Sequence, residues 1–119
     1  MTVAIWTLSM LSIAEFTFAP VNLWTGRTMP NFTRFTGLAP EVATRALAPV
    51  KLATAAALAV GLAVPAIGLA GAALATAICA FYLLRMAAPA RRHPDGLVAF
   101  TVFGSWALAL LILRAIELA

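Results

Sequence analysis

The sequence has few charged residues and almost none of the side chains from which metal sites and catalytic triads are built. Its 119 residues include eight lysines and arginines, four aspartates and glutamates, one histidine and one cysteine. The single Cys79 excludes a disulfide within the chain, and no cysteine–histidine cluster has metal-site spacing. The single His93 lies in the turn RRHPDG, where a solvated loop residue is expected rather than a base. We therefore expect no metal, no cofactor and no histidine-based catalysis.

Apolar residues take the place of the missing charges. They make up 64% of the chain, against about 45–50% in soluble domains. A soluble domain of this size leaves too much of its surface in water to hide so many apolar side chains. The sequence therefore predicts an integral membrane protein in contact with a lipid bilayer. The net charge of +4 then indicates topology at the membrane surface, not nucleic-acid binding.

Four apolar segments are each about 20 residues long, which is the length that spans a bilayer. They cover residues 2–21, 45–64, 65–86 and 96–118. Pro65, together with Gly61 and Gly68, interrupts the second and third segments, so GLAVPAIG predicts a tight hairpin. The connection after the first segment is rich in Thr, Asn, Gly, Pro and aromatic residues, which is typical of an interfacial loop or short amphipathic turn. The predicted fold is an all-α membrane protein, a four-transmembrane-helix antiparallel bundle formed by one domain, residues 1–119.

Six of the seven arginines fall on one side of this predicted bundle. With four spans, the loops between helices 1 and 2 and between helices 3 and 4 share one face, while both termini and the hairpin share the other. The first face carries Arg27, Arg34, Arg45, Arg85, Arg91 and Arg92. The second face has only Arg114, with Glu117 one turn beyond. The positive-inside rule then predicts cytoplasmic 1–2 and 3–4 loops and both termini outside. The first segment lacks a basic start and a small-residue cleavage site, so we expect a retained helix and not a signal peptide.

Two opposite charges are predicted to lie at the same depth in the membrane. At about 1.5 Å per residue, Glu15 lies roughly 20 Å along the first span and Lys51 about 10 Å into the second from the cytoplasmic side. These depths match in a core about 30 Å thick. An unpaired charge at the centre of a membrane helix costs about 2.5–3.5 kcal/mol, which favours an ion pair. The alternative is that Lys51 extends to the headgroups and Glu15 carries a proton.

Further polar residues share the helix faces of these two charges. Asn22 follows Glu15 by two turns, and Thr54 follows Lys51 by three residues, so a polar strip is predicted to open towards the cytoplasmic loop. The candidate catalytic residues are Glu15 and Lys51, and the candidate ligand-binding residues are Asn22, Trp24, Arg27 and Thr54. The strip is either such a site or a structural contact between helices.

Residues 45–86, RALAPVKLATAAALAVGLAVPAIGLAGAALATAICAFYLLRM, resemble the DoxX-like family of small four-helix membrane proteins. The shared pattern is a Leu-rich helix, a Gly-Leu-x-x-Pro hairpin and an Ala/Gly helix that ends with Arg85. The chain departs from it because members often have an acidic residue at the position of Lys51, a lysine at that of Asn22 and a histidine before the arginine. The resemblance implies a DoxX-like four-helix bundle. It also implies membership of a redox complex, since the family is named after subunits of a thiosulfate:quinone oxidoreductase.

Three functions stay open. The first is an accessory or subunit component of a membrane complex, quinone-linked by analogy, with a protein subunit or a second copy of the chain as partner. The alternative is a binder or cofactor-independent enzyme, of isomerase or cyclase type, that acts on a lipophilic small molecule through Glu15 and Lys51. The third is a transporter, for which four short helices leave little room for alternating access.

Overall fold

The computed structural model describes residues 2–88 and 94–119, and every regular element in these ranges is a helix. The elements are α1 (Thr2–Trp24), α2 (Met29–Thr36), α3 (Pro40–Val42), a π-helical turn η1 (Ala43–Leu47), α4 (Ala48–Val60), α5 (Pro65–Met86) and α6 (Pro94–Leu118). The predictions for Arg91, Arg92 and His93 lie outside the described residues.

Four of these helices are long and apolar enough to cross a membrane, as the sequence predicts. They are α1, the continuous run Pro40–Val60, α5 and α6. The first span is longer than expected because α1 continues through Pro20 to Trp24. The second is shifted towards the N-terminus: it begins at Pro40, and it ends at Val60 because residues 61–63 form the turn to α5. Large apolar side chains point outward along these spans, as a lipid environment allows.

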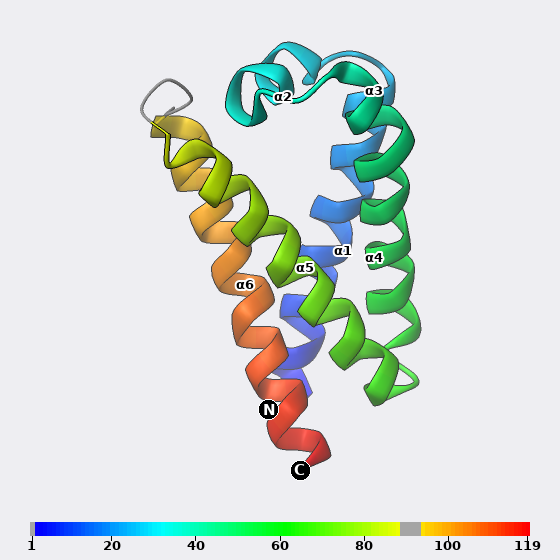
Figure 1. Ribbon diagram of the computed structural model, residues 1–119. Helices are drawn as coiled ribbons and strands as arrows, with labels where there is room; N and C mark the ends of the chain where they lie inside the picture. Colours follow the sequence, from blue (N-terminus) through cyan, green and yellow to red (C-terminus); the bar gives the residue numbers. More distant parts are fainter. Residues whose placement is uncertain (1, 89–93) are drawn as a thin grey trace.

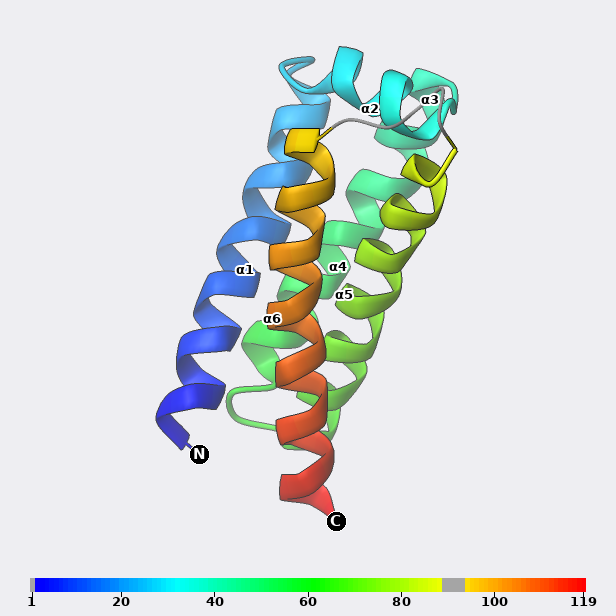
Figure 2. The same cartoon turned by 90° about the vertical axis from the view of Figure 1, so that its left-hand side faces the viewer.

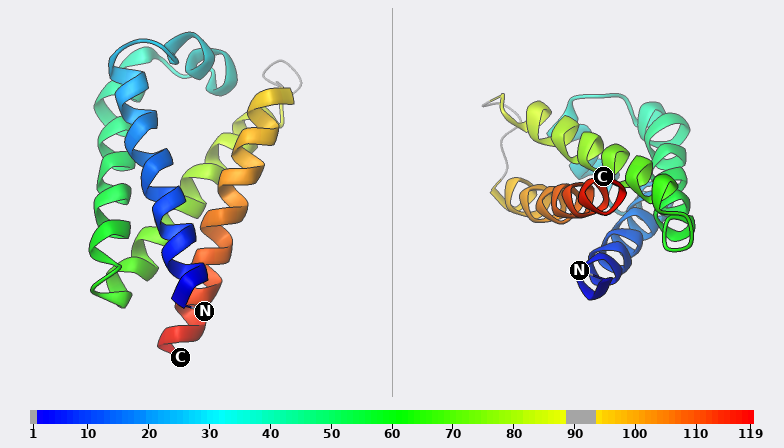
Figure 3. Two further views of the ribbon diagram at one scale, coloured as in Figure 1. Left: turned by 180° about the vertical axis from the view of Figure 1, so that it is seen from behind. Right: turned by 90° about the horizontal axis from the view of Figure 1, so that it is seen from below.

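The four spanning helices form an antiparallel bundle (Figures 1 and 2). α1 packs against α4 and α6, and α5 packs against α4 and α6. Figure 3 shows the same arrangement from behind, with α1 between α4 and α6. Both termini lie at the end of the bundle that holds the α4–α5 turn, and α2 crosses the opposite end (Figure 1). This second end carries the connection between the first two spans.

Two glycines close the α4–α5 hairpin. A Cβ added to Gly61 would lie 2.6 Å from the Gly68 backbone nitrogen and closer still to its Cα. The two backbones can therefore meet only because both positions lack a side chain. Arg114 of α6 completes this end, with one guanidinium nitrogen donating to the Gly61 carbonyl at 2.6 Å and another to Glu117 Oε1 at 2.8 Å. Arg114 is 4% exposed, so it is a buried contact between helices and not the surface charge that the sequence suggests.

From the contact between Gly61 and Gly68, α4 and α5 diverge towards the end crossed by α2 (Figure 1). The core follows the same division. A small apolar cluster around Leu58, Ala72 and Leu110 fills the narrow end. A larger cluster, rich in aromatic residues such as Phe16 and Phe32, fills the wide end. Because the helices diverge, the wide end has room for large side chains and for a cavity among them.

Candidate functional site

A cavity of about 200 Å³ lies at the wide end of the bundle, below α2. Five helices contribute to its wall: α1, α2, α4, α5 and α6. The lining residues are Glu15, Phe18, Ala19, Asn22, Leu23, Thr28, Asn31, Phe32, Phe35, Lys51, Tyr82 and Phe100. Apolar and aromatic side chains surround a few polar groups in this set, which is the usual composition of a small-molecule site.

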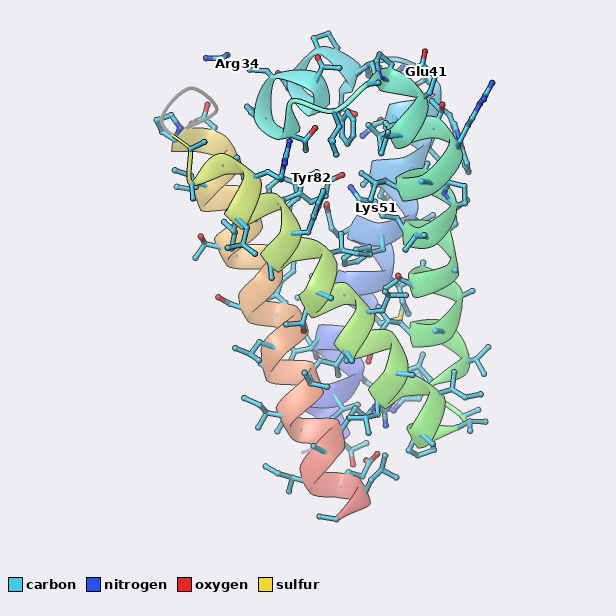
Figure 4. The ribbon with its side chains drawn as sticks, viewed as in Figure 1. Arg34, Glu41, Lys51 and Tyr82 are labelled. Atoms are coloured by element: carbon cyan, nitrogen blue, oxygen red, sulfur yellow. The ribbon has the colours of Figure 1, made fainter. Side chains whose placement is uncertain are left out.

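Lys51 is the more deeply buried of the two charged residues of the cavity. It is 4% exposed, and its Nζ lies 4.4 Å from the centre of the Tyr82 ring. Figure 4 shows the two side chains pointing towards one another, from α4 and α5. Within the described part of the chain, the ammonium group makes this cation–π contact and no hydrogen bond. A face of an aromatic ring stabilises a cation but leaves its three N–H donors without acceptors.

Glu15 faces the same cavity from α1. Residues 15, 18, 19 and 22 recur at the spacing of one helix face, and all four line the cavity. The prediction that Glu15 and Asn22 share a face is therefore confirmed, because α1 continues through Pro20. Glu15 is partly buried, and its carboxylate stays outside ion-pair distance of Lys51. Among residues 2–88 and 94–119, the ion pair with a nitrogen–oxygen distance below 4.0 Å is Arg114–Glu117. The two charges thus share a cavity without the direct ion pair that the sequence favours.

Aromatic rings form one wall of the cavity behind Lys51. Tyr82 stacks on Phe100 with ring centres 4.5 Å apart and planes inclined by 11°. Phe32 of α2 meets Tyr82 edge-on at 6.4 Å and 82°. Because stacked and edge-to-face pairs both stabilise aromatic clusters, this wall holds its shape without a ligand.

The short helix α2 covers the cavity, where the sequence predicts only an interfacial loop or amphipathic turn. Its residues Phe32, Phe35 and Thr36 are buried, whereas Arg34 faces outward (Figure 4). Gly37 ends the helix with a φ of 66°, a left-handed conformation that suits glycine. Arg85 of α5 then donates from Nε to the Thr36 carbonyl at 2.7 Å. This charged hydrogen bond attaches the end of α2 to the bundle.

Three of the predicted ligand-binding residues lie away from the cavity wall. Thr54 is fully buried, and its hydroxyl donates to the Val50 carbonyl at 2.8 Å within α4. The indole nitrogen of Trp24 donates to the Thr44 carbonyl at 3.0 Å and so ties α1 to η1. Arg27 is exposed in the turn after α1. Of the six predicted site residues, the structure brings together Glu15, Asn22 and Lys51.

The sequence interpretation missed Tyr82, Asn31 and Phe100. Tyr82 had a usable signal, because it is the only tyrosine of the chain and lies within an apolar span. Asn31 and Phe100 had none, since they approach the cavity only through the docking of α2 and the packing of α6. Cys79 is buried on α5, and Gly104 of α6 lies opposite it. It behaves as a small apolar residue, as the sequence suggests.

The arrangement defines a helical membrane protein with a cavity inside its wide end. Glu15 is the cavity's only carboxylate, and within residues 2–88 and 94–119 no three His, Cys, Asp or Glu side chains lie close enough to hold a metal ion. No protein-family model, no curated protein and no solved structure matches the chain. The chemistry open to the site is that of one ammonium, one carboxylate, two amides and the hydroxyls of Thr28 and Tyr82 among aromatic rings.

Proposed function

We propose that the protein binds a lipophilic small molecule within the membrane, through Lys51 and Glu15. The observation that carries this proposal is the environment of Lys51. The Lys51 side chain is 4% exposed, it lines the cavity, and its ammonium group has no hydrogen-bond acceptor among the described residues. A buried cation loses its hydration, and leaving its donors unused is costly. An oxygen of a bound molecule supplies the missing acceptor.

The wall of the cavity supports a lipophilic ligand. Four phenylalanines and Tyr82 contribute to it. Phe18, which is 66% exposed on α1, also lines the cavity, so the cavity reaches the outer surface of the bundle there. Because Phe18 lies on a helix apolar enough to cross a membrane, a ligand enters from the bilayer side.

A second candidate function, acid–base catalysis of isomerase or cyclase type, is favoured by one observation. Glu15 and Lys51 open to the same cavity without neutralising each other in a direct contact. A carboxylate and an amine held on two sides of one molecule can remove and return a proton with no cofactor. Catalysis predicts that Glu15→Gln still binds the ligand but no longer converts it.

The proposed orientation places the cavity in the cytoplasmic half of the membrane. Arg27, Arg34 and Arg45 are exposed at the end that holds α2, whereas Arg114 at the other end is buried. An excess of exposed arginine is typical of cytoplasmic loops. Membership of a quinone-linked membrane complex, as the resemblance to the DoxX-like family implies, stays a prediction.

Native mass spectrometry in mild detergent tests the proposal. We expect the wild-type protein to retain a lipophilic compound that is distinct from bilayer lipids, and Lys51→Met to lose it. Arg34→Met is the matched control, because it removes a cation from the same end on the outer side of α2 (Figure 4). Glu15→Gln is measured in the same way, with the exposed Glu41→Gln as its matched control. Wild-type protein that carries only bilayer lipid contradicts the proposal.

A further inference from the structure

We propose that the ligand of this cavity carries a neutral hydroxyl group on a single aromatic ring, as a phenol does. The inference rests on the proposed function and names the chemical class that the site selects. It follows from the charge balance of the cavity, from its volume and from its aromatic wall.

The charge balance favours a group that both accepts and donates a hydrogen bond. Lys51 offers donors only, and Glu15 offers acceptors. Because the two are more than 4.0 Å apart, a polar atom can lie between them. An anion there is repelled by Glu15 and a cation by Lys51, whereas a hydroxyl accepts from Lys51 and donates to Glu15. The site is thus matched to a neutral hydroxyl.

The volume limits the ring system. The cavity measures about 200 Å³. A cavity of about 150 Å³ in another protein holds one benzene ring. The space here therefore suits one substituted ring, and larger apolar groups have to extend past Phe18 into the bilayer.

The wall favours an aromatic ring over an aliphatic one. Tyr82 and Phe100 present a stacked pair, and Phe32 and Phe35 from α2 lie above it. Phe100 and the Lys51 ammonium occupy the two faces of Tyr82, so a flat ring meets Tyr82 at its edge and can pack against the other rings of the wall, and each such contact adds to the burial of apolar area. A saturated ring of the same size gains only the burial of apolar area and no contact between aromatic rings.

Fluorine NMR on the whole chain in nanodiscs tests this inference, with empty nanodiscs as the background. The probes are 4-fluorophenol, 4-fluoroanisole, 4-fluorobenzoate and trans-4-fluorocyclohexanol. Methylation in the anisole removes the donor, the benzoate adds a charge, and the cyclohexanol removes the aromatic face. We expect the phenol to bind about tenfold or more tightly than the anisole, which is the fold-change for one hydrogen bond to a charged group, and also more tightly than the benzoate and the cyclohexanol.

Variants link the preference to the cavity. In Glu15→Met, which removes the acceptor of the phenol's proton, the advantage of the phenol over the anisole falls to about one, whereas the exposed Glu41→Met keeps the wild-type ratio. Glu15→Met replaces a partly buried carboxylate with an apolar chain of similar length, so it leaves the fold intact. Ala19→Phe, which fills the cavity from α1, abolishes binding of all four probes.

The measurements distinguish a failure of the phenol assignment from a failure of the proposed binding function. Equal binding of phenol and anisole, or tighter binding of benzoate or cyclohexanol, overturns the phenol assignment and leaves the binding function in place. The same holds if no probe binds while native mass spectrometry shows a retained compound. If no probe binds and no compound is retained, both proposals are wrong. A preference for phenol over anisole that persists in Glu15→Met places the phenol elsewhere and also overturns the inference.

Discussion

Gly61→Ala is expected to open the narrow end of the bundle. The added methyl group would lie 2.6 Å from the Gly68 nitrogen and 3.0 Å from the Ala57 carbonyl oxygen. Both neighbours are backbone atoms, which cannot rotate away. Favourable contacts between such atoms begin near 3.5 Å, so α4 and α5 have to separate by roughly 1 Å.

The expected loss combines two effects at the same place. Overpacking of this kind costs typically 1–3 kcal/mol. The Gly61 carbonyl also accepts the 2.6 Å hydrogen bond from Arg114, and a bond of this kind to a charged donor contributes about 1.5–3 kcal/mol. If the separation of the helices breaks it, the total loss is about 2.5–6 kcal/mol. Because Arg114 is almost fully buried, water replaces this partner poorly.

Unfolding by SDS titration in mixed micelles, followed by tryptophan fluorescence, measures this loss. The matched control is Gly104→Ala, which makes the same chemical change inside a spanning helix. Its methyl group would meet only the Cβ of Cys79, at 3.3 Å, so we expect a change within about 1 kcal/mol. Wild-type stability of Gly61→Ala, or equal losses in the two variants, would refute the close-contact reasoning.

Three further predictions concern the wide end. Arg85→Gln removes the charged hydrogen bond to the Thr36 carbonyl, so amide exchange in α2 should accelerate by a factor that corresponds to about 1.5–3 kcal/mol; unchanged exchange would mean that packing alone holds α2. Ala19→Phe fills the cavity and should prevent retention of the lipophilic compound in native mass spectrometry without lowering the melting temperature; retention would place the compound elsewhere. In a background without Cys79, a membrane-impermeant maleimide added to intact cells should label Ala63→Cys but not Thr33→Cys, and the reverse pattern would invert the proposed orientation.

Part of the site could be predicted from sequence because helix periodicity is a local property. Glu15 and Asn22 are seven residues apart, and any continuous helix places them on one face. The equal depth of Glu15 and Lys51 also follows from chain length, since each residue adds a fixed rise. Thr54 could not be judged in this way. It shares a helix with Lys51, but its hydroxyl bonds to the preceding turn of α4, a choice that sequence spacing does not reveal.

The role of Arg114 shows the same limit from the other end of the chain. As a sequence feature it is a basic residue near the C-terminus with a glutamate one turn beyond. Whether it faces lipid headgroups or the inside of the bundle depends on the rotation of α6 about its axis. The packing of α6 on α5 sets that rotation, and it turns Arg114 towards the carbonyl of Gly61.

The sequence by itself determines the class of protein: long apolar segments must be shielded from water, and in lipid a helix satisfies its own backbone hydrogen bonds. It also determines where the helices are interrupted, since Gly61 and Pro65 act locally. Only the tertiary structure decides that a cavity exists. The helices α4 and α5 meet at Gly61 and Gly68 and diverge from there, α2 docks across the wide end, and Lys51 meets Tyr82 instead of Glu15. These are long-range contacts between helix faces, and their geometry depends on how the whole bundle packs.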